Sequence, residues 1–217
     1  MSIDHKLAAA LVASVLLTAS APPVHAQALY DAFVKAVVED RRAEVRSLLA
    51  RGMDPNTVDP NGEPVLLIAA RSGWMETLEA LLAAGAKVDG QNGVGDTALM
   101  VAALQGRLPI VKKLLSANAS LNRSGWTPLI YAATNAHDDV VRTLLEAGAD
   151  IDAASPNGTT ALMMATRGGH AKTVSLLLEK GADPNRRNDS GATALSWARR
   201  GGFVPVEEAL LRRGARS

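Results

Sequence analysis

Residues 158–190 read GTTALMMATRGGHAKTVSLLLEKGADPNRRNDS, and this stretch decides the fold. It holds a short apolar helix pattern, a glycine-rich turn, a second helix pattern with consecutive leucines, then a glycine and a polar loop. Residues 125–157, GWTPLIYAATNAHDDVVRTLLEAGADIDAASPN, repeat this order. The opening glycines recur at intervals of 33, 30, 33 and 33 residues; they are Gly62, Gly95, Gly125, Gly158 and Gly191. A fixed period of this size predicts a stacked array of repeated units.

The repeated motif resembles that of the ankyrin-repeat family over Tyr30 to about Ala215. The resemblance implies an all-α solenoid of stacked helix–turn–helix units, joined by β-hairpin loops that we call fingers. We expect about six units, at 30–61, 62–94, 95–124, 125–157, 158–190 and 191–217. The first and last act as caps, because a terminal repeat needs a polar outer face to stay soluble.

Helix ends can be predicted from the same motif. Thr127 is expected to cap a first helix through its hydroxyl, with Pro128 at the first helical position, where no N–H is needed. Thr97, Thr160 and Thr193 repeat the cap, whereas Pro64 takes the threonine position in the second unit. A left-handed residue should end each second helix. The residues at that position are Gly52, Gly85, Asn118, Gly148, Gly181 and Gly214.

The predicted core is built from small and aliphatic residues. Aromatic residues make up only 3% of the chain, against 47% apolar residues. Alanine pairs in the first helices allow close packing of neighbouring units, and leucine pairs in the second helices supply the continuous core. Trp197 and three methionines of the first helices are also expected in the core. The residues are Ala69-Ala70, Ala102-Ala103, Ala132-Ala133, Leu81-Leu82, Leu114-Leu115, Leu144-Leu145, Leu177-Leu178, Leu210-Leu211, Met100, Met163 and Met164.

The single interval of 30 residues predicts one short finger. The segment from Asn118 to Ser124 has three residues fewer than its sister loops. Loops tolerate deletion better than the elements they connect. We therefore expect the finger between the third and fourth units to be shortened and the binding surface to be uneven.

The first 26 residues resemble a secretory signal peptide that is cleaved after Ala26. An apolar run from Leu7 to Ala19 follows Lys6, and it is about half of the roughly 20 residues that a membrane-spanning helix needs. An uncleaved N-terminal anchor is the alternative. Cleavage would leave a mature domain at 27–217. The chain has no cysteine, which suits export to a bacterial periplasm.

The composition argues against several functions. The 23 Lys and Arg nearly balance the 22 Asp and Glu, so the chain lacks the basic excess of most nucleic-acid binders. His137 and His170 stand just after the inter-helix turn, where Trp74, Arg107 and Phe203 stand in other units, and a structural role is expected for both. No catalytic or phosphate-binding motif is present. We expect no enzyme activity, catalytic residue, metal site or cofactor.

The resemblance also implies a binding surface. In ankyrin proteins, residues beside the opening glycine and at the start of the inter-helix turn face a concave groove. On this chain they are Asn61, Glu63, Arg71, Ser72, Asp96, Leu104, Gln105, Ser124, Trp126, Thr134, Asn135, Asn157, Thr159, Arg167 and Arg200. Trp126 is either a central partner contact or a packing residue over the short finger. Arginines make the C-terminal third basic, which fits either a solvated cap or docking to an acidic partner.

The leading hypothesis is an exported, monomeric module that binds a protein partner, as a periplasmic scaffold, protector or inhibitor. An immunity protein against a toxin is one form of it. The main alternative is a secreted effector that binds host proteins. The partner's identity does not follow from the sequence, because one fold can serve many functions.

Overall fold

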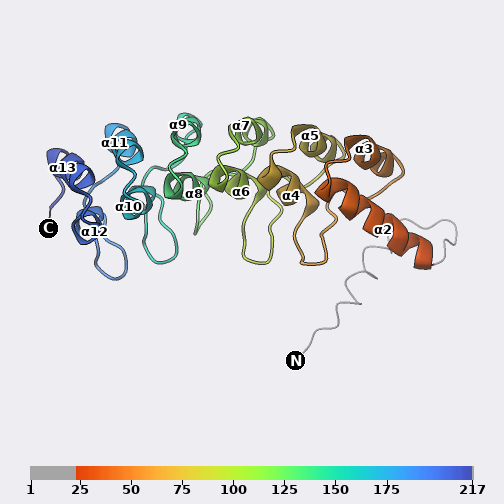
Figure 1. The fold of residues 1–217 in the computed structure, drawn as a ribbon, viewed down its shortest axis with the longest axis horizontal. Coiled ribbons are helices and arrows are strands. Elements are labelled where there is room, and N and C mark those ends of the chain that lie inside the picture. Colours follow the sequence, from red (N-terminus) through yellow and green to blue (C-terminus); the bar gives the residue numbers. More distant parts are fainter. Residues whose placement is uncertain (1–22, 217) are drawn as a thin grey trace, which may run out of the picture.

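The computed structural model describes residues 23–216 as a row of helix pairs (Figure 1). The first helices of the pairs lie in one layer and the second helices in another, with the connecting loops extending beyond the first layer. The first helices are α2 (Pro23–Val38), α4 (Val65–Ser72), α6 (Ala98–Leu104), α8 (Pro128–Thr134), α10 (Ala161–Arg167) and α12 (Ala194–Gly201). The second helices are α3 (Arg42–Ala50), α5 (Met75–Ala83), α7 (Leu108–Ser116), α9 (Asp138–Glu146), α11 (Ala171–Glu179) and α13 (Val204–Arg212). No strand forms within residues 23–216, so this part of the chain is an all-helical solenoid.

The predicted threonine caps are present at four first helices. The Thr127 hydroxyl accepts a hydrogen bond from the Ile130 N–H at 3.3 Å, and Pro128 occupies the first turn. Thr97, Thr160 and Thr193 accept equivalent bonds from the residue three positions later. Helix α4 differs, because Pro64 has no side-chain acceptor to offer. Each threonine cap satisfies a backbone donor that would otherwise lack a partner at the helix start.

The second helices end as predicted in left-handed residues. The glycine at this position has a φ of 92° at Gly85 and 93° at Gly148. Asn118 replaces the glycine after α7 and has a φ of 61°. Asparagine tolerates this conformation better than other residues with a side chain, so the helix stops in the same way.

The core follows the prediction for the first helices and departs from it for the leucine pairs. The six paired alanines of α4, α6 and α8 are fully buried, and so are the first leucines Leu81, Leu114, Leu144, Leu177 and Leu210. The second leucines are less buried: Leu178 is 5% exposed, Leu82, Leu115 and Leu145 are half-buried, and Leu211 is 46% exposed. Successive residues of a helix point about 100° apart, so both members of a pair cannot face the core equally. Trp197 is also half-buried rather than fully in the core, whereas Met100, Met163 and Met164 are buried.

The short finger is confirmed before α8. Three other fingers each close with an isolated antiparallel bridge: Val58 to Pro64, Gln91 to Thr97 and Ala154 to Thr160. The fingers before α8 and α12 have no such bridge, and of these two the finger before α8 reaches less far from the helices (Figure 1). The three missing residues therefore come from the finger tip.

A ladder of Asn and Asp side chains joins neighbouring units at the base of the fingers. Asn56 Oδ1 accepts the Lys87 N–H at 2.8 Å, and Asp89 Oδ1 accepts the Ser120 N–H at 2.9 Å. Asn122 Oδ1 accepts the Asp150 N–H at 2.8 Å, although the short finger follows it. Asp152 and Asn185 continue the ladder to Asp183 and Arg216. The deletion therefore leaves the contact between units intact.

The N-terminal segment is only partly within the described residues. Most of the predicted signal peptide, 1–26, lies outside them, and helix α2 begins at Pro23, upstream of the expected start at Tyr30. The Tyr30 hydroxyl donates to the Val58 carbonyl at 2.9 Å, which joins α2 to the first finger. Among the described helices, none is both long and apolar enough to span a bilayer.

Candidate functional site

Two rows of equivalent positions run along the array beside the fingers. The first row follows the opening glycine of each unit and consists of Glu63, Asp96, Trp126, Thr159 and Ala192. The second row lies eight residues later, at the end of each first helix, and consists of Arg71, Leu104, Thr134, Arg167 and Arg200. We call the surface formed by these two rows and the finger loops the finger face. It contains most of the residues predicted to contact a partner.

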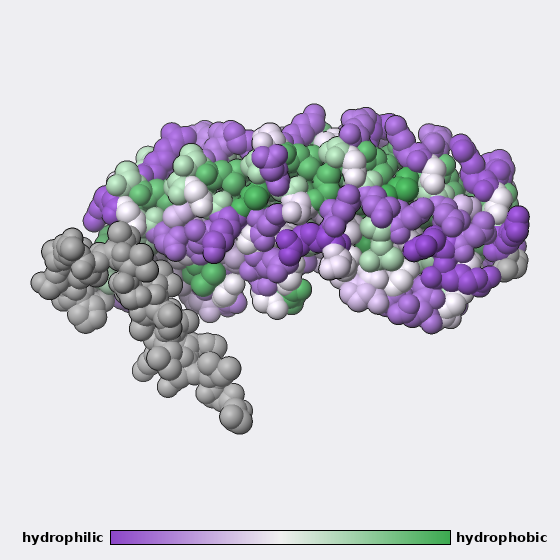
Figure 2. Space-filling model, turned by 180° about the vertical axis from the view of Figure 1, so that it is seen from behind, coloured by the Kyte–Doolittle hydropathy of each residue, from purple (hydrophilic) through white to green (hydrophobic). Residues whose placement is uncertain are grey.

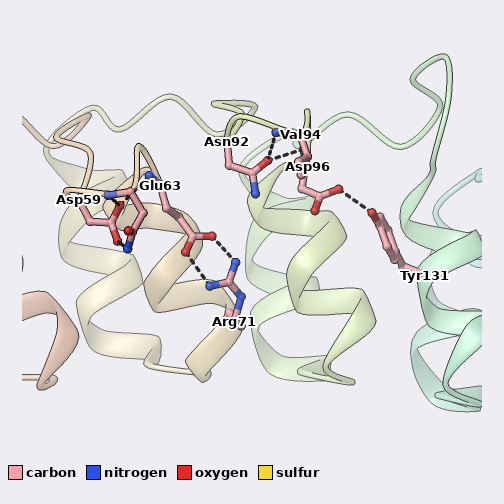
Figure 3. Close-up of polar contacts among 8 residues, drawn as sticks. Asp59, Glu63, Arg71, Asn92, Val94, Asp96 and Tyr131 are labelled. Carbon is pink, nitrogen blue, oxygen red and sulfur yellow. Dashed lines mark hydrogen bonds and ion pairs between the residues drawn. The ribbon is translucent and has the colours of Figure 1, made fainter. Parts of the chain in front are cut away.

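Glu63 and Arg71 show that the two rows face each other. Arg71 Nη1 donates to Glu63 Oε2 at 2.6 Å, and Arg71 Nη2 donates to the other carboxylate oxygen (Figure 3). The hydrogen bond to Glu63 raises the pKa of the Arg71 guanidinium. Asp59 Oδ1 accepts a hydrogen bond from the Glu63 backbone N–H at 2.8 Å, and this bond positions the backbone from which the Glu63 side chain extends. Two-pronged pairing of this kind is specific as well as strong.

Asp96 occupies the next position of the first row and contacts the following unit. The Tyr131 hydroxyl of α8 donates to Asp96 Oδ1 at 2.6 Å (Figure 3). Asn92 Oδ1 accepts the Val94 and Asp96 N–H groups at 3.1 and 3.0 Å and thereby shapes the finger that carries Asp96. Burial, together with the hydrogen bond and charge of Asp96, raises the pKa of Tyr131. Tyr131 was not singled out from the sequence.

Trp126 lies where the finger is short. Its ring stacks on Tyr131, with centroids 5.5 Å apart and planes at 29°, yet 37% of the residue remains exposed. Trp126 is therefore held by packing and also open to solvent, so the two roles considered for it are compatible. Val94, at the tip of the neighbouring finger, is 83% exposed. Figure 2 shows a long face of the array where apolar side chains form a band between hydrophilic margins.

The first row changes character in the C-terminal units. Thr159 is only 3% exposed, and its backbone N–H donates to Ser155 Oγ at 3.1 Å. The buried Thr159 side chain therefore offers a partner little surface, although Thr159 was among the residues expected to face the groove. Ala192 has no charge. Arg167 and Arg200 are exposed, and within residues 23–216 neither makes an ion pair.

The other predicted contact residues divide by exposure. Asn61, Gln105, Ser124, Asn135 and Asn157 are exposed, and Ser72, Leu104 and Thr134 are half-buried. Several of them bond within the protein. Asn135 Nδ2 donates to the Leu104 carbonyl at 2.9 Å, and the Thr134 hydroxyl donates to the Ile130 carbonyl at 2.8 Å. These bonds hold the start of the inter-helix turns in place.

The two histidines join neighbouring units. His137 Nε2 lies 2.9 Å from the Leu104 carbonyl oxygen, and His170 Nε2 lies 3.0 Å from the Thr134 carbonyl oxygen. Arg107 does the same through Nε, 3.1 Å from the Arg71 carbonyl oxygen. In these three units, this position connects the unit to the last turn of the preceding first helix. Across residues 23–216, no group of three or more His, Asp or Glu side chains is arranged to hold a metal ion.

Two features that support the finger face were not predicted from the sequence: the Asn and Asp ladder, which joins neighbouring units, and Tyr131, which contacts Asp96 and Trp126. The ladder had a visible signal, since Asn56, Asp89, Asn122, Asp152 and Asn185 recur at the intervals of the repeat. Tyr131 had none, because its equivalents in other units, Ile68, Val101, Met164 and Trp197, share no polar group at that position.

Comparison with known families agrees with the geometry. A model for ankyrin repeats in three copies matches residues 33–124, 85–155 and 152–217. The chain belongs to the ankyrin-repeat family. These ranges overlap and cover the array from its first cap to its last. Ankyrin repeats indicate a protein–protein interaction module. The comparison with curated proteins gave no match.

Proposed function

We propose that this ankyrin-repeat protein is exported to the periplasm, where it binds a protein partner through the finger face as a monomer and catalyses no reaction. One observation carries the choice of surface: Trp126 remains 37% exposed while stacked on Tyr131 beside the short finger. In this role the protein would scaffold, protect or inhibit its partner.

The physics of interfaces supports Trp126 as a main contact. Trp, Tyr and Arg contribute most often to interface hot spots. The stack on Tyr131, and the bond from Tyr131 to Asp96, hold the indole in one place before binding. A contact that is already ordered loses less entropy when the complex forms. The side chain therefore meets the requirements of an anchor.

Export is supported by the sequence before the array. The apolar run from Leu7 to Ala19 and the small residues around Ala26 fit a signal peptide. The absence of cysteine means that the domain needs no disulfide in an oxidising compartment. Cleavage after Ala26 would make Gln27 the N-terminus of the mature protein.

A pull-down from periplasmic extract tests the proposal. Tagged protein is compared with the double variant Trp126→Ala, Arg167→Ala and with a control of the same net charge, Arg142→Ala, whose exposed side chain lies on the second helix α9. We expect one stoichiometric partner with the parent and the control. Loss of the Trp126 contact alone should cost about 2 kcal/mol, or roughly thirtyfold in affinity.

Fractionation and N-terminal sequencing check the location. The proposal predicts a periplasmic protein that begins at Gln27. Protein found mainly in the culture medium would replace the periplasmic role with that of a delivered effector. A partner that binds the finger-face variant as tightly as the parent would show that a different surface is used.

A further inference from the structure

The charges of the array are divided along its length. Residues 158–217 contain ten Lys and Arg against five Asp and Glu, whereas residues 1–157 contain 13 against 17. Four of the C-terminal cations are engaged within the protein. Arg199 Nε donates to Glu207 Oε1 at 2.8 Å, and Arg187 Nη1 donates to the Gly191 carbonyl at 2.9 Å. Lys172 pairs with Asp138 at 3.0 Å, and Arg212 pairs with Glu208 at 3.7 Å. Arg167 and Arg200, in the second row of the finger face, differ from these cations because neither makes an ion pair within residues 23–216.

Arg71, Arg167 and Arg200 occupy the same position in three units. Each stands eight residues after the first-row position of its own unit. In the unit of Arg71 that position is Glu63, and the carboxylate pairs with the guanidinium. In the other two units it is the buried Thr159 and Ala192, neither of which carries a charge. The array therefore has two guanidinium positions for which the fold supplies no carboxylate.

The two positions are one unit apart. Arg167 ends α10 and Arg200 lies in the last turn of α12, and these helices pack against each other (Figure 1). Packed helices have axes about 8–10 Å apart. Equivalent side chains on α10 and α12 are thus separated by roughly 10 Å in the direction of the array.

We propose that the C-terminal half of the finger face binds an acidic, extended segment of the partner, with one carboxylate on Arg167 and another on Arg200. Each carboxylate takes the place that Glu63 occupies on Arg71. In a polyproline II segment, residues i and i+3 project on the same side about 9 Å apart, which matches the separation of the two positions. The inference rests on the proposed function and defines the partner as acidic, with two carboxylates three residues apart.

Synthetic peptides test the spacing. The probe is a fluorescein-labelled, proline- and alanine-rich peptide with two glutamates at positions i and i+3. One comparison peptide has the glutamates adjacent, and another has both replaced by glutamine. We expect the i, i+3 peptide to bind the full chain at least tenfold more tightly than either comparison, by fluorescence anisotropy, and to lose affinity as salt is added.

Matched variants test the two arginines. Arg167→Gln with Arg200→Gln should abolish the preference for the i, i+3 peptide, and the control Arg142→Gln with Arg213→Gln, which has the same net charge, should keep it. Equal binding of the adjacent-glutamate peptide, equal loss in the control, or equally tight binding of a charge-matched oligonucleotide would overturn the inference. In the pull-down, a partner that needs Trp126 but survives Arg167→Gln with Arg200→Gln would leave the proposed function standing and refute only the acidic segment.

Discussion

At the scale of single residues, two buried threonines of the same repeat should respond in opposite ways to one substitution. Thr166 is fully buried and its hydroxyl has no hydrogen-bond partner, whereas the buried Thr173 donates to Asp138 Oδ1 at 2.7 Å. The equivalents of Thr166 in the three preceding units are Ala70, Ala103 and Ala133, so the position is apolar there. An unpaired buried polar group costs about 1–3 kcal/mol.

Valine keeps the shape of threonine and removes the hydroxyl. We predict that Thr166→Val raises the free energy of unfolding by about 1 kcal/mol, and that Thr173→Val lowers it by a similar amount because Asp138 loses a donor. Urea denaturation of the two variants beside the parent measures both. A loss of stability in Thr166→Val would mean that its hydroxyl is satisfied.

Tyr131 gives a pH dependence with a defined sign. Its pKa in the folded protein is raised above the ordinary value of 10.0, chiefly by burial. As the pH rises past 10, the unfolded state therefore releases this proton first, and the free energy of unfolding falls. Below that pH the group is protonated in both states and contributes no slope.

Replacing Tyr131 with phenylalanine removes the contribution of its phenol to the pH dependence of the free energy of unfolding. We predict that stability falls less steeply between pH 9 and about 11.5 in Tyr131→Phe than in the parent, measured by urea unfolding at each pH. Tyr30, whose pKa is also raised by burial, stays in both proteins and provides a common background. Parallel pH profiles would contradict the assignment.

Residue-level predictions from the sequence succeeded where the cause is local. Thr127 caps its helix and Asn118 adopts a left-handed φ because the backbone within a few positions decides both. They missed burial and contacts that depend on residues elsewhere in the unit or in the next unit. The burial of Thr159 depends on how Ser155 closes the finger, and the Tyr131–Asp96 bond joins residues 35 positions apart.

At the scale of elements, the length of the short finger should affect the exposure of Trp126 to a partner and not the free energy of unfolding. Its deletion lies after Asn122, whose bond to the Asp150 N–H preserves the contact between units. Lengthening a loop by a few residues costs little conformational entropy. Restoring three residues between Arg123 and Ser124 should therefore leave the fold intact and cover Trp126.

We predict that this insertion changes the free energy of unfolding by less than about 1 kcal/mol. In a Trp74→Phe, Trp197→Phe background, acrylamide should quench the remaining Trp126 fluorescence less in the lengthened chain than in its parent. Unchanged quenching would show that finger length does not control the exposure of Trp126.

The second helices show how an end unit differs from an inner one. Each second helix carries a leucine pair, yet its second member is buried at Leu178 and 46% exposed at Leu211. Helix α13 packs over α11, whereas within residues 23–216 no helix packs over the far side of α13. We predict that Leu178→Ala costs about 2–5 kcal/mol, as for other buried leucines, and that Leu211→Ala at the equivalent position costs no more than about 0.5 kcal/mol. Equal losses in thermal or urea unfolding would contradict the described register.

At the scale of the whole molecule, the repeat predicted the architecture but not the charge pattern of the finger face. Period, caps and Ala-rich packing were readable because every unit repeats them. The difference in charge between the two ends of the finger face was not readable. It depends on the ion pair between Glu63 and Arg71, eight residues apart in one unit, and on the lack of a carboxylate eight residues before Arg167 and Arg200. Within the two rows of the finger face, an anionic partner segment would meet guanidinium groups without a carboxylate only at Arg167 and Arg200.

The most direct test of the central claim, that the finger face binds a protein, is photo-crosslinking in the cells that produce this chain. A photoreactive phenylalanine analogue is placed at Trp126 in one protein and at Arg142, exposed on α9, in another. We predict one discrete crosslinked species of higher mass from position 126 and none from position 142. Crosslinking from position 142 alone, or equally from both positions, would contradict the account.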